Sequence, residues 1–355
     1  MILPGLIDIH VHLRSPGQTH KEDFTTGTKA ALAGGFTTIL DMPNNIVPIT
    51  TKRLLDDKIN FAKTNILCDV GFYFGSQGNN IMEFEKVKKD VFGIKLYLNE
   101  TTGNFLVNNI ALEKIFKMWP KNYGPILVHA EDNAIDEVIS YVRKTKKPTH
   151  FCHITLRSDL IQISNAKKQG LPITCGVTPH HLFLTSEDEK KLQSYGKMKP
   201  YLKTTADVSY LWEKLHEIDV IESDHAPHTK KEKENPISTS PYGVPGLEST
   251  LPLLLTALHQ KMLKITDIIR LCHENPKKIF HLPNQDSSVE VDLEEEYLFE
   301  EKNLFTKSAW SPFSGRLMHG RVKRVLLRGE TVYENGEILA KLGSGHVIKP
   351  DLIFI

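Results

Sequence analysis

The sequence predicts an α/β protein: a closed parallel (β/α)₈ barrel of the TIM type with a small C-terminal β-module. Short apolar segments rich in β-branched residues alternate with helical segments eight times over about 220 residues, as a closed barrel requires. Polar side chains follow the ends of several of these segments. With 355 residues, 40% of them hydrophobic, the chain can bury a barrel-sized core. A doubly wound open sheet is the alternative.

The barrel strands are expected where apolar and β-branched residues lie between turn signals. In chain order these segments are residues 4–14, 36–42, 68–74, 92–98, 126–129, 149–153, 173–177 and 220–223. The first segment organises the rest, because residues two apart on a strand point to the same face. His10 and His12 therefore project together.

Helices are expected between the strands, each opened or closed by a recognisable signal. They are residues 19–34, 50–63, 81–89, 110–118, a segment from 131, 159–169, a segment from 186, 206–215, 247–262, 267–272 and 276–280. Thr19 and Glu22 have the spacing of a capping box for the first helix, and Gly34-Gly35 ends it. Residues 99–104 form a polar loop long enough to act as a flap, and 229–240 are expected to be a second loop.

The pattern changes after Pro283, which divides the chain into a barrel of residues 1–283 and a β-rich module of residues 284–355. Half-exposed strands are expected at 289–293, 322–327 and 331–333. Asn335-Gly336 predicts a two-residue hairpin turn. The acidic run at 294–296 is expected to be a solvated strand edge or loop.

Composition excludes several classes of protein. The 44 Lys and Arg residues balance 43 Asp and Glu, so a net charge of +1 gives no field to recruit nucleic acid or a membrane surface. No secretory signal begins the chain and no run of about 18 apolar residues occurs, which predicts a soluble, cytoplasmic protein. The four cysteines form no C-x-x-C pair and are expected to stay reduced.

Candidate metal ligands fall where the predicted strands end. They are His10, His12, Lys95, His129, His153 and Asp224. Each alone has an ordinary explanation, such as a histidine satisfied in the core or an aspartate that caps a helix. Together they would meet at one end of the barrel, where a metal gives them a common role. Imidazoles and a carboxylate suit Zn²⁺, and Mn²⁺ or Co²⁺ remain open on ligand type.

Lys95 is unusual because it interrupts an apolar barrel strand. It could pair with a carboxylate across the barrel. Alternatively, burial and nearby cations lower the pKa of the amine, which in its neutral form can take up carbon dioxide as a carbamate. That anion offers two oxygens and could bridge two metals.

Several motifs resemble the dihydroorotases of the cyclic amidohydrolase superfamily, most closely the dihydroorotase domains of animal multifunctional pyrimidine-synthesis proteins. The motifs, which run nearly end to end, are Pro4–Arg14 with Pro16-Gly17 and His20–Asp23, Met42-Pro43-Asn44, Lys95-Leu96-Tyr97, His129-Ala130-Glu131, Cys152-His153, Pro179-His180-His181, Ser223–His228 and Pro245–Glu248. The resemblance implies reversible cyclisation of N-carbamoyl-L-aspartate to L-dihydroorotate in pyrimidine synthesis.

The resemblance also assigns roles to residues. Two Zn²⁺ ions per chain would be bridged by carboxylated Lys95, with His10, His12 and Asp224 on one ion and His129 and His153 on the other. A bridging hydroxide would attack the ring carbonyl, and Asp224 would transfer its proton to the leaving nitrogen. Arg14, Asn44 and His228 would hold the substrate carboxylate, under a flap around Thr101. A homodimer and association with other pyrimidine-pathway enzymes are expected.

Three departures from the family pattern accompany these matches. Gly176 stands where animal-type members have Glu, which puts in doubt an additional metal that would use Cys152 and that Glu. Thr102 replaces an aromatic residue of the flap, and Lys199 stands in place of an Arg. Cys152, His181 and Lys199 are secondary candidates for the site.

Two alternatives remain. A related cyclic amidase, such as a hydantoinase, dihydropyrimidinase or allantoinase, would share the metals without needing a carboxylate clamp. A non-catalytic paralogue with a structural role would characteristically lack metal ligands, whereas every expected ligand is present in this sequence.

Overall fold

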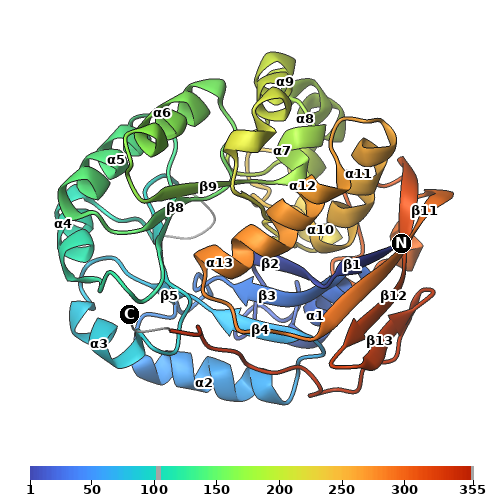
Figure 1. Cartoon of the computed structure of the whole chain (residues 1–355), viewed down its shortest axis with the longest axis horizontal. Coiled ribbons are helices and arrows are strands. Elements are labelled where there is room, and N and C mark those ends of the chain that lie inside the picture. The colour runs from blue at the N-terminus through green and yellow to red at the C-terminus, as the bar shows by residue number, and fades with distance from the viewer. Residues whose placement is uncertain (101–104, 353–355) are drawn as a thin grey trace.

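Parallel strands form a closed barrel in the computed structural model, which describes residues 1–100 and 105–352 (Figure 1). The barrel strands are β2 (Leu6–Val11), β3 (Phe36–Asp41), β4 (Asp69–Phe72) with its continuation β5 (Phe74–Gly75), β6 (Ile94–Tyr97), β7 (Ile126–His129), β8 (Thr149–Phe151), β9 (Ile173–Val177) and β10 (Val220–Ile221). Two hydrogen-bonded runs, β2-β3-β4 and β5 to β10, make up the wall. A parallel bridge between Val11 and His225 joins the last strand to the first. The predicted barrel is confirmed.

Helices surround the strands on the outside of the barrel (Figure 1). They are α1 (Phe24–Ala33), α2 (Lys52–Lys63), α3 (Phe84–Val87), α4 (Asn109–Met118), α5 (Asn133–Thr145), α6 (Arg157–Lys168), α7 (Pro179–Phe183), α8 (Ser186–Leu192), α9 (Thr205–Glu213), α10 (Lys230–Lys233), α11 (Leu247–His259), α12 (Ile265–Ile269) and α13 (Asn275–Ile279). Helix α5 is typical: it buries Ile135, Val138, Ile139 and Val142, the spacing of one helical face.

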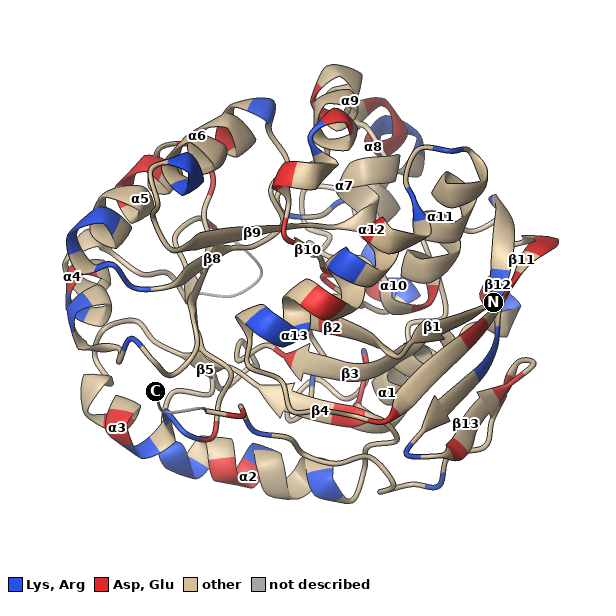
Figure 2. Ribbon diagram, in the orientation of Figure 1, with Lys and Arg blue, Asp and Glu red and all other residues tan. Residues whose placement is uncertain are grey.

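Charged residues of both signs are spread over the helices (Figure 2). No helix in the described part of the chain is long and apolar enough to span a membrane. All four cysteines are free and buried, as expected for reduced thiols.

Helix boundaries show where local signals were wrong. Asp23, not Thr19, caps α1, because its side chain accepts from the Thr26 N–H. Glu22 is instead turned into the protein, where it accepts a hydrogen bond from the Lys307 N–H. The expected loop 229–240 contains the short helix α10, and the helix expected over 247–262 ends at His259. The sequence also missed α7, and α5 begins two residues after its expected start.

The C-terminal strands form an antiparallel sheet beside the barrel, in the order β1 (Ile2–Pro4), β11 (Ser287–Leu298), β12 (Leu317–Leu327), β13 (Glu330–Glu334) and β14 (Glu337–Ile338). Asn335 and Gly336 have φ of 48° and 93°, which confirms the hairpin turn. The acidic run lies within β11, where Glu295 pairs with Arg321. Because β1 comes from the first residues of the chain, the sheet combines the start of the chain with strands from residues 287–338. A division at residue 283 stays a prediction.

Two carboxylates, of the buried Glu22 and the partly buried Glu248, attach the module to the barrel. Glu248 on α11 accepts hydrogen bonds from the backbone N–H groups of Phe305 at 2.8 Å and Thr306 at 3.0 Å. Glu22 accepts from the Thr306 hydroxyl and lies 3.2 Å from His225 Nε2. Burial raises the pKa of Glu248 to about 8, since the two N–H donors offset only part of the desolvation.

This raised pKa predicts a pH-dependent stability. The Glu248 carboxyl keeps its proton in the folded protein up to about pH 8, whereas an unfolded chain loses it near 4.5. Its contribution is therefore present in full at low pH and is lost as the pH rises through this interval. We expect Glu248→Gln to melt at a temperature closer to wild type at about pH 5 than at about pH 9, where the variant is relatively more stable. Scanning calorimetry measures this, with the exposed Glu330→Gln as control. A pH-independent difference would contradict the assignment.

Candidate metal centre

The first and last strands of the barrel bring together the best-defined cluster of candidate ligands. His10 lies on β2, His12 follows it, and Asp224 follows β10 with a φ of 42°. The His12 N–H donates to the His225 carbonyl at 2.8 Å, and the Ser223 N–H lies 3.2 Å from both carboxylate oxygens of Asp8. Backbone contacts on both sides of Asp224 therefore fix its position beside the two histidines.

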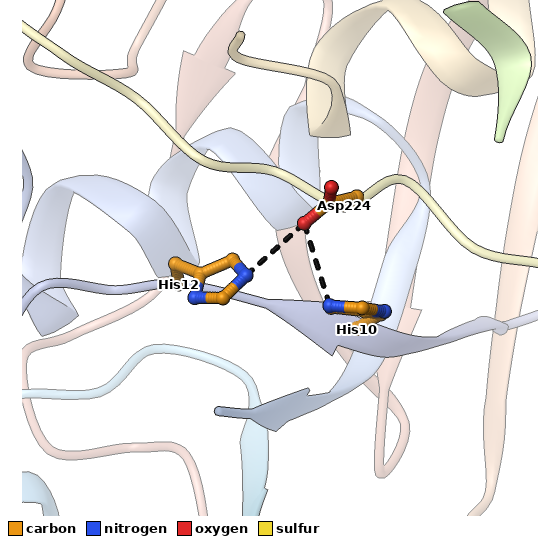
Figure 3. Close-up of side chains that lie close together, drawn as sticks. All are labelled: His10, His12 and Asp224. Carbon is orange, nitrogen blue, oxygen red and sulfur yellow. Dashed lines mark hydrogen bonds and ion pairs between the residues drawn. The ribbon is translucent and has the colours of Figure 1, made fainter. Parts of the chain in front are cut away.

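His10 and His12 both direct Nε2 toward Asp224 (Figure 3). The distance to Asp224 Oδ1 is 3.0 Å from His12 Nε2 and 3.4 Å from His10 Nε2. The other ring nitrogens face acceptors: His12 Nδ1 lies 2.7 Å from Asn44 Oδ1, and His10 Nδ1 lies 3.0 Å from Glu222 Oε2. When Nδ1 carries the proton, the Nε2 lone pair points to Asp224, as a metal ligand requires.

The protonation states of this cluster also suit a metal. Burial lowers the pKa of His12 to about 4, although Asp224 acts in the opposite direction. Burial by itself raises the pKa of Asp224, but His10 and His12 beside it bring that pKa well below its usual range. A neutral imidazole and an ionised carboxylate are the forms that bind metal ions.

A second pair of imidazoles lies next to the first cluster. His129 ends β7 and His153 follows β8, and their Nδ1 and Nε2 atoms are 3.1 Å apart. The rings of His153 and His10 have centroids 5.2 Å apart, so the two groups adjoin. Glu131 lies 3.2 Å from His129 Nε2. Burial lowers the pKa of both histidines, which favours neutral imidazoles.

Lys95 is fully buried on β6. Its Nζ donates to Cys152 Sγ at 3.0 Å and lies 5.2 Å from the centroid of the Tyr97 ring. Within the described residues, no carboxylate forms an ion pair with this amine, so the pairing across the barrel that the sequence left open is not found.

Some of the candidate substrate-binding residues line the cavity, and others do not. Arg14, Asn44 and Lys199 line the same cavity as His10, His12, His129, His153 and Asp224, together with Tyr97 and Tyr242. His228 is buried next to Arg14, with Nε2 3.2 Å from a guanidinium nitrogen. Lys199 Nζ lies 4.0 Å from the centroid of the Tyr201 ring. Thr101 and Thr102 lie outside the described residues.

His181 does not share the cluster's contacts. Its Nε2 donates to the Pro200 carbonyl at 2.9 Å, and its Nδ1 lies 2.6 Å from the Thr178 hydroxyl. Both ring nitrogens are thus used to hold the turn after β9. Its secondary role stays a prediction.

Sequence reasoning missed Glu222, whose side chain is fully buried beside His10. The signal was available, because Glu222 is a charge at the end of an apolar barrel strand, as Lys95 is within one. Tyr242 was also missed. It comes from the loop before α11, and the sequence gives no local sign that this loop reaches the cavity.

A buried ion pair supports the loop that carries Asn44. Lys58 Nζ on α2 lies 2.7 Å from Asp41 Oδ2 and donates to the Met42 carbonyl at 2.9 Å. Asp41 in turn accepts from the Leu13 N–H at 2.8 Å. One ion pair therefore fixes both the strand end next to Arg14 and the start of the Asn44 loop.

Comparison with known proteins gives the family. Residues 1–151 match the Amidohydrolase family. The chain is 42% identical over 350 residues to the multifunctional protein CAD of Squalus acanthias, covering 98% of this chain but 16% of the shark protein. It is 36% identical over 374 residues to the dihydroorotase of Pyrococcus abyssi, covering 98% of this chain and 87% of that protein. The chain belongs to the dihydroorotase family. The resemblance predicted from the motifs is confirmed.

Solved structures of this family and its neighbours share the fold. An L-hydantoinase (dihydropyrimidinase) from Arthrobacter aurescens has a TM-score of 0.93 at 23% identity and covers 98% of this chain and 89% of its own. An inactive dihydroorotase-like domain of the Chaetomium thermophilum CAD-like multifunctional protein has a TM-score of 0.84 at 26% identity, covering 98% and 99%. Membership of this family implies a metal cofactor, and His10, His12 and Asp224 form a candidate site for it.

The Asp41–Lys58 pair generates a prediction. Lys58→Met leaves a buried carboxylate without its partner, which destabilises proteins by about 3–5 kcal/mol. The control is Arg53→Met on the same helix, because Arg53 and Asp57 are an exposed pair. The loss of unfolding free energy in Arg53→Met is expected to stay below about 1 kcal/mol. Urea unfolding measures both, and equal shifts in midpoint would contradict the role of the buried pair.

Proposed function

We propose that this chain is a dihydroorotase, which interconverts N-carbamoyl-L-aspartate and L-dihydroorotate in pyrimidine synthesis. The observation that carries the proposal is the convergence of His10 and His12 Nε2 on Asp224, in a cavity that Arg14 also lines. Dihydroorotase relatives that align with 98% of the chain support it.

The donor set fits a metal centre. His10 and His12 already direct Nδ1 at side-chain oxygens, which leaves Nε2 for a cation shared with Asp224. These residues would hold one Zn²⁺, His129 and His153 would hold a second, and carboxylated Lys95 would reach both. Bound zinc lowers the pKa of a coordinated water and polarises a substrate carbonyl.

Asp224 is the proposed proton carrier. In hydrolysis, water oxygen adds to the ring carbonyl carbon, the carbon–nitrogen bond breaks, and Asp224 moves the water proton to the leaving nitrogen. Cyclisation uses the same transfers in reverse and releases water. The ionised form of the Asp224 carboxylate is the one that would accept the first proton.

Arg14 and Asn44 are proposed to bind the substrate carboxylate. The Arg14 Nε donates to the Pro227 carbonyl at 3.2 Å, which holds the guanidinium at the cavity wall. A guanidinium suits a carboxylate because it donates two parallel hydrogen bonds. His228 would act with Arg14, which it adjoins. The flap residue Thr101 stays a prediction.

Two alternatives make different demands. A hydantoinase substrate has no carboxylate for Arg14 to bind, so the charge in the cavity favours dihydroorotate. Against a non-catalytic role, the described residues retain the whole histidine set and Asp224 around one cavity. A homodimer, association with other pathway enzymes and a cytoplasmic location are further parts of the proposal.

Turnover tests the substrate assignment. The purified protein, loaded with Zn²⁺, is expected to convert dihydroorotate and N-carbamoyl-L-aspartate, and to leave hydantoin and allantoin largely unchanged. Ultraviolet absorbance follows the ring in both directions. A chelated sample is the control and should be inactive. Turnover of hydantoin without turnover of dihydroorotate would establish the competing amidase.

Variants separate the metal centre from substrate binding. Arg14→Ala is expected to raise KM for dihydroorotate roughly 10- to 100-fold with bound zinc unchanged, since a charged hydrogen bond contributes about 1.5–3 kcal/mol. Lys95→Ala or His10→Ala should lose both zinc and turnover. Reloading chelated wild type in buffer without bicarbonate should give less active enzyme if Lys95 carries a carbamate. Full activity of Lys95→Ala would refute the bridge.

A further inference from the structure

Glu222 places a carboxylate inside the barrel wall next to both groups of histidines. Its Oε2 lies 3.0 Å from His10 Nδ1, and its Oε1 accepts from the His153 N–H at 2.5 Å. His150 Nε2 lies 3.8 Å from Oε2. The side chain is fully buried, so these contacts replace water completely. One carboxylate thus touches a candidate ligand of each group.

The room for Glu222 comes from a glycine on the neighbouring strand. A Cβ added to Gly176 on β9 would lie 2.4 Å from Glu222 Oε1 and 2.8 Å from its Cδ. Gly176 pairs with Val220 of β10, so the two strands lie side by side at this level. A side chain at position 176 and the carboxylate of Glu222 would occupy the same volume. The position of the Glu222 side chain therefore depends on position 176 being glycine.

The contact with His10 has a direct consequence for the metal centre. A carboxylate accepts only, so the hydrogen bond places the ring proton on Nδ1 and leaves the Nε2 lone pair toward Asp224. Such outer partners orient metal-binding histidines, and removing them typically lowers metal affinity about 10- to 100-fold. We propose that Glu222 is a positioning residue that acts through His10, in space that Gly176 provides. The inference rests on the metal centre of the proposed function.

The same atoms allow a competing arrangement. His10, Cys152 and Glu222 offer ligand atoms that lie within 4.8 Å of one another and could hold a cation of their own. His10 Nδ1 cannot both donate to Glu222 and bind such a cation. The observed contacts favour the hydrogen bond, because Cys152 Sγ already accepts from Lys95. The two arrangements exclude each other, and experiment separates them.

The test uses zinc affinity, which needs no turnover. Chelated full-length protein is titrated with Zn²⁺ against a competing dye, and far-UV circular dichroism checks the fold. Glu222→Ala is expected to bind zinc about 10- to 100-fold more weakly. Gly176→Glu in that background returns a carboxylate to the same volume and should recover most of the affinity. Gly176→Glu alone should destabilise the protein, because two side chains compete for one space.

Controls and a second readout make the result decisive. Glu295→Gln alters a carboxylate that pairs with Arg321 in the C-terminal sheet, and it should leave zinc affinity unchanged. Nitrogen-15 spectra of the histidine rings should show a proton on His10 Nδ1 in wild type and its loss or exchange in Glu222→Ala. Cys152→Ser should keep the zinc content of wild type.

Two results would overturn the proposal. One is wild-type zinc affinity in Glu222→Ala. The other is loss of a single ion per chain in both Cys152→Ser and Glu222→Ala, which would assign these residues to a separate cation. If the expected affinities are found without conversion of dihydroorotate, Glu222 keeps its role and only the proposed substrate fails.

Discussion

The closing contact between the first and last barrel strands is the constraint on which the site depends. Val11 and His225 form the bridge that completes the wall, and the His12 N–H donates to the His225 carbonyl at 2.8 Å. Asp224 lies immediately before this bridge, so its carboxylate has little freedom to move away from His10 and His12. If this bridge between the first and last strands were broken, His12 and Asp224 would separate. Their side chains are in contact although they are more than 200 positions apart in sequence.

Two contacts between buried polar or charged side chains each hold a loop or a ring of this barrel in place. Lys58 with Asp41 fixes the segments next to Arg14 and Asn44, and Glu222 orients His10. Lys95 forms no ion pair with a carboxylate among the described residues, and neither does the fully buried Lys233, whose Nζ donates to the carbonyls of Lys197, Pro241 and Gly243. The Nζ of Lys95 donates instead to Cys152 Sγ. Unpaired charge inside a protein is rarely retained without a chemical reason. A sulfur partner in place of carbonyl oxygens distinguishes Lys95 from Lys233, and on the proposed function this amine would carry the carbamate.

Sequence patterns predicted the barrel and its candidate ligands because both follow from repeats of a few residues along the chain, such as the two-residue alternation of a strand. Strand alternation placed His10 and His12 on one side, and both do face Asp224. The patterns failed where a residue's partner is distant. Thr19 and Glu22 have capping-box spacing, but Glu22 is engaged by Thr306, far along the chain. Glu222 was overlooked although its charge ends an apolar strand, because its partners His10 and His153 come from other strands and its space comes from Gly176 on the neighbouring one.

Substrate choice in this fold must come from the cavity wall rather than from the barrel. The hydantoinase from Arthrobacter aurescens has a TM-score of 0.93 and an inactive domain has 0.84, so backbone similarity does not distinguish activity. Asn44 links the two requirements in this chain, because it lines the cavity beside Arg14 and also faces His12 Nδ1 at 2.7 Å. A substrate carboxylate that draws on the Asn44 amide would thereby act on a residue that orients a metal ligand. On the proposed function, recognition of the substrate carboxylate and orientation of the metal ligand His12 would meet at the Asn44 side chain.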